Sequence, residues 1–522
     1  MSKYKSEHLR HIAAHRQNTL RAAAGGPVTI RPLPTKPEEM SWRDYLIMLL
    51  HVGSELEHGL MVQYLYAAYS LGGDNLPPAD QALIRGWQDL ILTVAREEMG
   101  HLLTVQNLLC LVGGPVSFNR EEFPWDSPFY PFPFKFEPLS KQSLAAYIFA
   151  EMPDNFEYLE SHYDESIWGD RAKHFVEHDI PFIKATVREW VKRGDAHPVG
   201  EVYHLIIDII SNPDFIPDSE FRPETYPLQA SWDDWGRGYR PKPAPPSGDP
   251  PPVDNAKANV IIERAATRTE ALYALREIMD QGEASALKPK QKHPGGKNDD
   301  TATSQELSHF ERFAEMFQEF EQREGSPDWH PVRDVPLNPT TTVGNNPPDP
   351  RRPAFNRTPI TARASLKWAN LFNVRYRMLL TYLTHTFRLA RVVSPDVPNT
   401  RGAVMHRIFG EMYNLKTIAG ILVRMPLTNQ LNDPRRAGPP FQMPYTIELP
   451  LDEIDCWRLH RDIVLSSREL CDALLDPADD HLTTAPPAAE PYLRTLRNLD
   501  QQALVWIDTV LAGLRGNGGK RL

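Results

Sequence analysis

The chain has 522 residues, of which 41% are hydrophobic and 24% charged, and its formal net charge is -11. This length exceeds what one hydrophobic core usually organises, so we expect two domains or one domain with a large appendage. The charge excludes the basic surface that nucleic acid requires, and no stretch reaches the roughly 18 uninterrupted apolar residues of a membrane helix. Three widely spaced cysteines, without a Cys-x-x-Cys pair, indicate a reducing compartment and no thiolate metal site. We therefore expect a cytoplasmic protein that binds neither nucleic acid nor a membrane.

Helical periodicity dominates the chain. Apolar residues recur at three- and four-residue spacing from Trp42 to Leu71 and again from Asp80 to Val112, and glycine pairs end both runs. Because the connection between the runs is short, they predict an antiparallel helical hairpin. Almost no β-alternation occurs, so the predicted class is all-α. Further helices are predicted over residues 141–151, 173–192, 199–210, 259–281, 305–320, 365–393, 403–423, 452–474 and 492–514.

Proline-rich segments divide this pattern, and much of the chain's proline lies at residues 240–252 and 331–359. They read as ordered spacers between segments of strong helical pattern. We accordingly expect an N-terminal segment over residues 1–40, a metal-binding bundle over 41–325, a proline-rich linker over 326–360 and a C-terminal helical domain over 361–522.

Glutamate and histidine recur in this sequence at the spacing that two-metal sites use. A di-iron or di-manganese site in a four-helix bundle takes one Glu from each of two helices and Glu-x-x-His from each of the other two, since a spacing of three places both ligands on one helical face. Carboxylates neutralise two cations, and one imidazole for each metal leaves coordination positions open. The sequence supplies this set in chain order as Glu57, Glu98, His101, Glu201, Glu306 and His309.

The count of matches does not establish the site, because four Glu-x-x-His pairs occur and about one is expected by accident. Placement favours Glu98 and His101, which lie in a helix otherwise lined with apolar residues, where an unpaired charge is costly. Tyr64, two turns beyond Glu57, is positioned to hydrogen-bond a ligand from outside the metal shell. The alternatives are that Glu98 and His101 lie on a solvated helix face and that Tyr64 packs in the core. Whether His204 or Glu151 joins the site stays open.

Several strings in the first half of the chain match a known pattern. These strings are SELEHGLMVQYLYAAYSL, VAREEMGHLLTVQNLLCLVGGP, HPVGEVYHLI, DQGE and ELSHFERFAEMF. Over roughly residues 41–320 the chain resembles the ferritin-like domain of the iminophenylpyruvate dimer synthase family, whose members couple amino-acid-derived imines in violacein, rebeccamycin and staurosporine biosynthesis. The resemblance implies a ferritin-like four-helix bundle with long insertions and a C-terminal helical extension. It favours Glu201, Glu306 and His309 as ligands and leaves Glu283, in DQGE, as a rival to Glu306.

The resemblance implies an oxidative enzyme of secondary metabolism. Two iron ions, with manganese as the alternative metal, would act with dioxygen or peroxide on an aromatic substrate derived from an amino acid, and imine coupling is the reaction it suggests. Haem stays open as a further cofactor, since some members of the family are associated with it, although the sequence has no Cys-x-x-Cys-His motif. We expect a homo-oligomer. The competing hypotheses are a ferroxidase or peroxide-handling protein without organic substrate and a non-catalytic helical scaffold.

Overall fold

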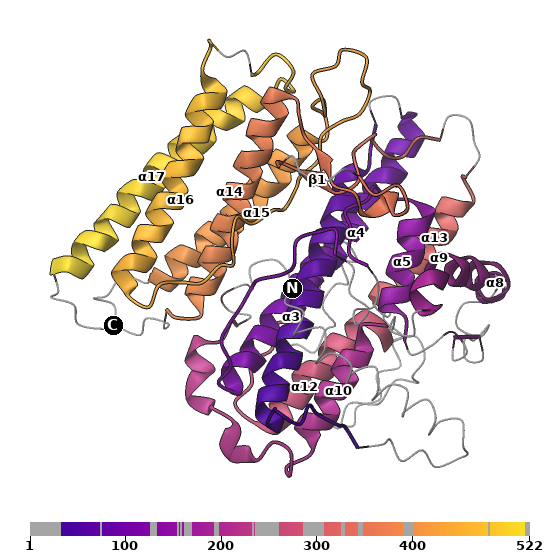
Figure 1. Ribbon diagram of the computed structural model, residues 1–522, viewed down its shortest axis with the longest axis vertical. Helices are drawn as coiled ribbons and strands as arrows, with labels where there is room; N and C mark the ends of the chain where they lie inside the picture. The colour runs from indigo at the N-terminus through magenta and orange to yellow at the C-terminus, as the bar shows by residue number, and fades with distance from the viewer. Residues whose placement is uncertain are drawn as a thin grey trace, which may run out of the picture.

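The computed structural model is all-α, as the sequence predicts, apart from a pair of two-residue parallel strands, β1 (Pro339–Thr340) and β2 (Thr358–Pro359) (Figure 1). It describes residues 33–73, 76–125, 133–153, 156, 159–160, 170–192, 198–231, 234, 260–284, 307–324, 329–342, 348–389, 400–478 and 481–516. Within these ranges no helix is long and apolar enough to span a membrane.

The longest helical hairpin is formed by α3 (Trp42–Ser70) and α4 (Pro78–Leu111), which pack along their length. Ser41 caps α3 by accepting a hydrogen bond from the Asp44 amide, and a proline begins α4, where no intrahelical donor is needed. Just past the two helix ends, Gly72 and Gly113 have φ values of 100° and 67°, which only glycine adopts readily. These local signals explain why the predicted helix boundaries agree with the structure to within two residues.

Two further helices complete a four-helix bundle with this hairpin. They are α5 (Lys141–Glu151) and α13 (His309–Glu321), which pack against each other, and α13 also contacts α4. Both begin with capping boxes, formed by Ser140 with Ser143 and by Ser308 with Glu311. The bundle therefore places the C-terminal end of α5 and the N-terminal end of α13 opposite the middle of the hairpin.

A long insertion separates α5 from α13, and its described helices lie beside the bundle (Figure 1). It contains α8 (Asp170–His174), the π-helix η1 (Phe175–Asp179), α9 (Ile180–Lys192), α10 (Gly200–Ser211), the 3-10 helices η2 (Asp218–Glu220) and η3 (Pro223–Leu228), α12 (Arg268–Met279) and the π-helix η4 (Asp280–Ala284). Of these, α9 packs on α5, while α10 packs on α3 and α12.

The helix predicted over 259–281 begins only at Arg268, because Thr267 forms a capping box there. Residues 260–265 lie along α4 without regular secondary structure, and the Ile261 carbonyl oxygen lies 2.5 Å from the position a Cβ on Gly100 would occupy. Gly100 therefore permits a close approach that any side chain would block.

Four C-terminal helices pack mainly on one another: α14 (Arg363–Thr386), α15 (Thr400–Leu422), α16 (Glu453–Leu475) and α17 (Ala489–Gly516). The buried guanidinium of Arg375 joins all four, since it contacts Glu411 on α15, Ser467 on α16 and Asp500 on α17 at 2.8, 3.1 and 2.5 Å. Described residues of the segment before α14, which includes η5 (Pro353–Phe355), contact the bundle; for example, the Gly72 amide donates to the Pro331 carbonyl. The proposed domain division stays a prediction.

Candidate metal centre

Five buried residues from the four helices of the bundle form two overlapping groups of candidate ligands. The first group consists of Glu57 on α3 with Glu98 and His101 on α4. The second consists of Glu98, Glu151 at the end of α5, and His309 at the start of α13. Because Glu98 belongs to both groups, it is placed to bridge two metal ions.

The distances support this bridging arrangement. One Glu98 oxygen, Oε2, lies 3.2 Å from His101 Nδ1, and the other, Oε1, lies 2.9 Å from His309 Nδ1. Glu57 Oε2 lies 3.5 Å from His101 Nδ1, and Glu151 Oε2 lies 3.7 Å from His309 Nδ1. Each imidazole thus faces the shared carboxylate and one carboxylate of its own.

The donor atoms fit metal ions better than they fit one another. Glu57 Oε2, Glu98 Oε1 and His309 Nδ1 are buried without a hydrogen bond of acceptable geometry. Beside Glu57, Glu98, His101 and Glu151 lies a cavity of about 20 Å³. Leaving such groups without hydrogen bonds in a protein interior is costly, and hard oxygen donors with one imidazole for each metal suit iron or manganese. The residues present therefore fit a two-metal centre.

The electrostatics of the cluster favour cations. Burial, together with the nearby charge of Glu98, raises the pKa of Glu57 to about 8. Burial would lower the pKa of His101, but its contacts with Glu57 and Glu98 outweigh burial and raise it to about 10. Burial likewise opposes protonation of His309, yet the charge of Glu98 and contacts with Glu151 and Glu97 hold its pKa well above the usual value. The carboxylates therefore attract positive charge, which protons on the imidazoles or metal ions can supply.

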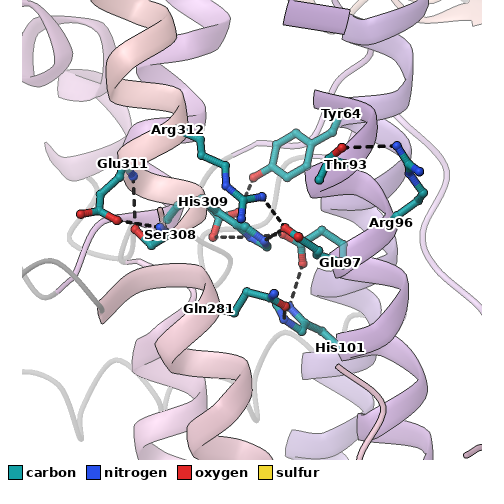
Figure 2. Close-up of polar contacts among 12 residues, drawn as sticks. Tyr64, Thr93, Arg96, Glu97, His101, Gln281, Ser308, His309, Glu311 and Arg312 are labelled. Atoms are coloured by element: carbon teal, nitrogen blue, oxygen red, sulfur yellow. Dashed lines mark hydrogen bonds and ion pairs between the residues drawn. The ribbon is translucent and has the colours of Figure 1, made fainter. Parts of the chain in front are cut away.

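Hydrogen bonds outside the cluster orient both imidazoles (Figure 2). His309 Nε2 lies 3.0 Å from Glu97 Oε2, which also accepts a 2.6 Å hydrogen bond from Arg312. His101 Nε2 lies 2.9 Å from Gln281 Oε1 on η4. Because a carboxylate and an amide oxygen can only accept, both Nε2 atoms carry the proton, and both Nδ1 atoms face the carboxylates.

Two phenols hold the terminal carboxylates. Tyr64 donates a 2.5 Å hydrogen bond to Glu151 Oε1, and Tyr203 donates to Glu57 Oε1. The sequence placed Tyr64 beside a ligand, and the structure places its hydroxyl on a candidate ligand. Sequence reasoning missed the outer contacts of Tyr203, Glu97 and Gln281, for which only adjacency to candidate ligands in GEVYH, REEMGH and DQGE offered a signal.

The structure brings together four of the six residues that the sequence selected, namely Glu57, Glu98, His101 and His309. Glu201 is half-buried on the first turn of α10 and belongs to neither group. The reason is that α5, not α10, packs against α13 as the third helix of the bundle, so Glu151 takes the place expected for Glu201.

The remaining candidates are placed as follows. Glu306 lies outside the described residues, and Glu283 is described only in its backbone. His204, half-buried on α10, also belongs to neither group.

Two characterised proteins match the chain. Over 437 residues it is 24% identical to dichlorochromopyrrolate synthase of Lentzea aerocolonigenes, a match that covers 77% of this chain and 36% of that protein. Over 149 residues it is 30% identical to 2-imino-3-(indol-3-yl)propanoate dimerase of Chromobacterium violaceum, which covers 23% of this chain and 14% of that protein. The matches thus span only about a third or less of the length of these relatives. No solved structure matches the chain.

These relatives agree with the family resemblance that the sequence motifs carry. The family model termed Ferritin-like matches residues 50–318, more than half of the chain, and this range contains all five clustered candidate ligands. With its four-helix bundle, the protein belongs to the Ferritin-like family.

Proposed function

We propose that the protein is a di-iron oxidoreductase of secondary metabolism that acts on an aromatic substrate derived from an amino acid. The observation that carries the proposal is the position of Glu98, whose two oxygens face two different histidines inside the bundle. The names of the two relatives, a synthase and a dimerase of an indolyl imine, support the substrate class. The gathering of Glu57, Glu98, His101, Glu151 and His309 also weighs against a scaffold whose charged residues are merely paired in the core.

In the proposed site Glu57 and His101 would hold one metal ion, Glu151 and His309 would hold the other, and Glu98 would contribute an oxygen to each. Glu306, three residues before His309, is the further carboxylate that we expect from the same helix. Bound iron would supply the redox chemistry with dioxygen or peroxide.

The chain's own groups orient the ligands and limit access. The Glu97 carboxylate and the Gln281 amide keep the Nε2 proton on each imidazole, while the phenols of Tyr64 and Tyr203 fix the terminal carboxylates. Apolar side chains wall the small cavity beside the cluster and restrict water, notably Leu60, Val199, Ile278 and Met279.

The proposed reaction class is oxidative coupling of two imine molecules. Joining two molecules through a new bond removes two electrons and two protons in total. Dioxygen can take them and leave as hydrogen peroxide, or hydrogen peroxide can take them and leave as two molecules of water. A ferroxidase would instead oxidise ferrous ions without consuming an organic molecule.

The first test is metal content per chain after aerobic purification, beside Glu98→Ala and His309→Ala variants. Close to two irons or manganeses per chain, lost in both variants, is the expected result, and Glu201→Ala serves as the matched control that retains them. The second test follows oxygen uptake and product mass when the iron-loaded protein meets imines of aromatic amino acids. A product of two imine masses less two hydrogens supports coupling, whereas repeated oxidation of ferrous ions without loss of imine points to the ferroxidase.

A further inference from the structure

A second cavity, of about 200 Å³, lies between the bundle and the C-terminal helices. Its walls come from α3 and α4 on one side and from α14 and α15 on the other, with Phe118 and Phe441 contributed by connecting segments. It is therefore formed only when the two halves of the chain meet.

This cavity is separate from the candidate metal centre. The two cavities share no lining residue. With about 100° of rotation per residue, Leu65 on α3 projects roughly 80° away from Glu57 and roughly 100° away from Tyr64, while Met61, four residues after Glu57, lies at the edge of the ligand face. The same holds on α4, where Arg96 points away from His309 (Figure 2). The hairpin thus presents one face to the metal ligands and a neighbouring face to the second cavity.

The interior of the cavity suits a flat apolar molecule. Its walls are mostly aliphatic and aromatic, and Met61, Met99 and Met412 supply polarisable side chains that adapt to a ring. An engineered apolar cavity of about 150 Å³ in another protein binds benzene, so this larger volume accommodates one or two fused rings. Tyr376 adds a fixed wall, because its hydroxyl is held by His58 at 2.6 Å and by Arg120 at 3.1 Å.

Charged residues among the lining are the less buried ones, which places them at the mouth. Arg96 is half-buried, and Lys416 is exposed on the facing helix α15. Hydrogen bonds within α4 hold the Arg96 guanidinium, from Nε to the Leu92 carbonyl and from Nη2 to Thr93 Oγ1. Asp89, the acidic residue of the lining, is exposed. The mouth therefore has two cations for one anion and favours a ligand with a single negative charge.

We propose that this cavity is a second small-molecule site, which binds an aromatic carboxylate of one or two fused rings with its ring between the bundle and α14–α15 and its carboxylate at Arg96 and Lys416. The site is independent of the metal centre and of the reaction proposed there. It gives the C-terminal helices a binding role in addition to packing.

Binding is tested with 2-naphthoate and its uncharged analogue 2-naphthylmethanol, by calorimetric titration of the full chain. We expect saturable binding of one 2-naphthoate per chain and about tenfold weaker binding of the alcohol. Two single substitutions, Ala95→Phe and Leu383→Trp, fill the cavity from opposite walls and should each weaken 2-naphthoate binding at least tenfold. Because either variant can fail to fold, helical circular dichroism and metal content are measured on both, and a folded one suffices.

The charged mouth is tested separately. The double variant Arg96→Gln/Lys416→Gln should lose about tenfold in affinity for 2-naphthoate, about 1.4 kcal/mol, with little change for 2-naphthylmethanol. Arg85→Gln removes an exposed cation of α4 that does not line the cavity and is the matched control. No saturable binding at millimolar concentration, or binding that survives in a folded cavity-filling variant, overturns the site. Equal affinities for acid and alcohol overturn the carboxylate assignment.

Discussion

His309 and Glu97 form a fully buried pair in which the imidazole Nε2 lies 3.0 Å from the carboxylate. Glu97 precedes the bridging candidate Glu98 in the chain, so two consecutive residues of α4 contact opposite nitrogens of one imidazole. Glu98 would bind metal, while Glu97 sets the tautomer of the His309 ring, which would bind the same metal.

Replacing Glu97 with Gln tests this positioning role. The amide keeps the size of the side chain but is neutral, so it weakens the hydrogen bonds that Glu97 accepts from His309 and Arg312. We therefore expect metal affinity to fall roughly 10- to 100-fold with the fold intact. Competition with a chelator measures the affinity, and Glu490→Gln, an exposed substitution on α17, is the control. Unchanged affinity in Glu97→Gln contradicts the role.

Comparing the variants Glu151→Ala and Glu201→Ala decides which of these two glutamates is the metal ligand contributed by the third helix of the bundle. Glu151 lies 3.7 Å from His309 and Glu201 lies in neither ligand group, so we expect about one metal per chain to be lost in the first variant and none in the second. Elemental analysis of both proteins gives the answer. Loss of metal from the Glu201 variant alone would restore the assignment made from sequence.

Asp179, at the end of η1 and outside the candidate metal centre, should make the stability of the fold depend on pH. Burial raises its pKa from 3.8 to about 6, although a 2.9 Å hydrogen bond from Gln318 favours the charged form. A raised pKa in the folded state means that this carboxyl stabilises the fold at low pH and that the contribution is lost as pH rises from about 4 through 6.

The variant Asp179→Asn keeps an acceptor for Gln318 and cannot ionise. We expect it to match the parent near pH 4 and to be more stable than the parent at pH 7 and above. Chemical denaturation at a series of pH values measures the difference, and a difference that does not grow with pH refutes the assignment.

Arg375→Met tests the cation that joins the four C-terminal helices. Removing it leaves the buried carboxylates of Glu411 and Asp500 without their partner, which should cost about 3–5 kcal/mol in stability. The triple variant Arg375→Met/Glu411→Gln/Asp500→Asn should recover part of the loss, because no unpaired charge is then buried. Arg461→Gln, which removes an exposed ion pair with Asp508, should change stability by less than about 1 kcal/mol.

Helix positions followed from the sequence where the signal is local. Apolar spacing, Ser41 as a cap, and the glycines after α3 and α4 depend on neighbours within a few residues, so the hairpin boundaries were predictable. The start of α12 was not, because residues 260–265 have no regular secondary structure, and Val260 and Ile261 lie against Gly100, which is distant in the chain.

The same distinction applies to the candidate ligands. Glu98 and His101 share a helix at a spacing of three, so their common face follows from helix geometry alone. Glu151 offers no such pattern, and its place in the cluster depends on α5 packing against α13 across a long insertion.

By itself the sequence determined an all-α chain, most of its long helices and a Ferritin-like bundle with a glutamate- and histidine-rich interior, because these depend on short-range periodicity and recurring motifs. Only the tertiary structure decided that Glu151 joins the cluster, that Glu97, Gln281 and Tyr203 contact its members, and that a second cavity opens against α14 and α15. Those features are contacts between helices far apart in the chain, and which helices meet is set by the packing of whole faces.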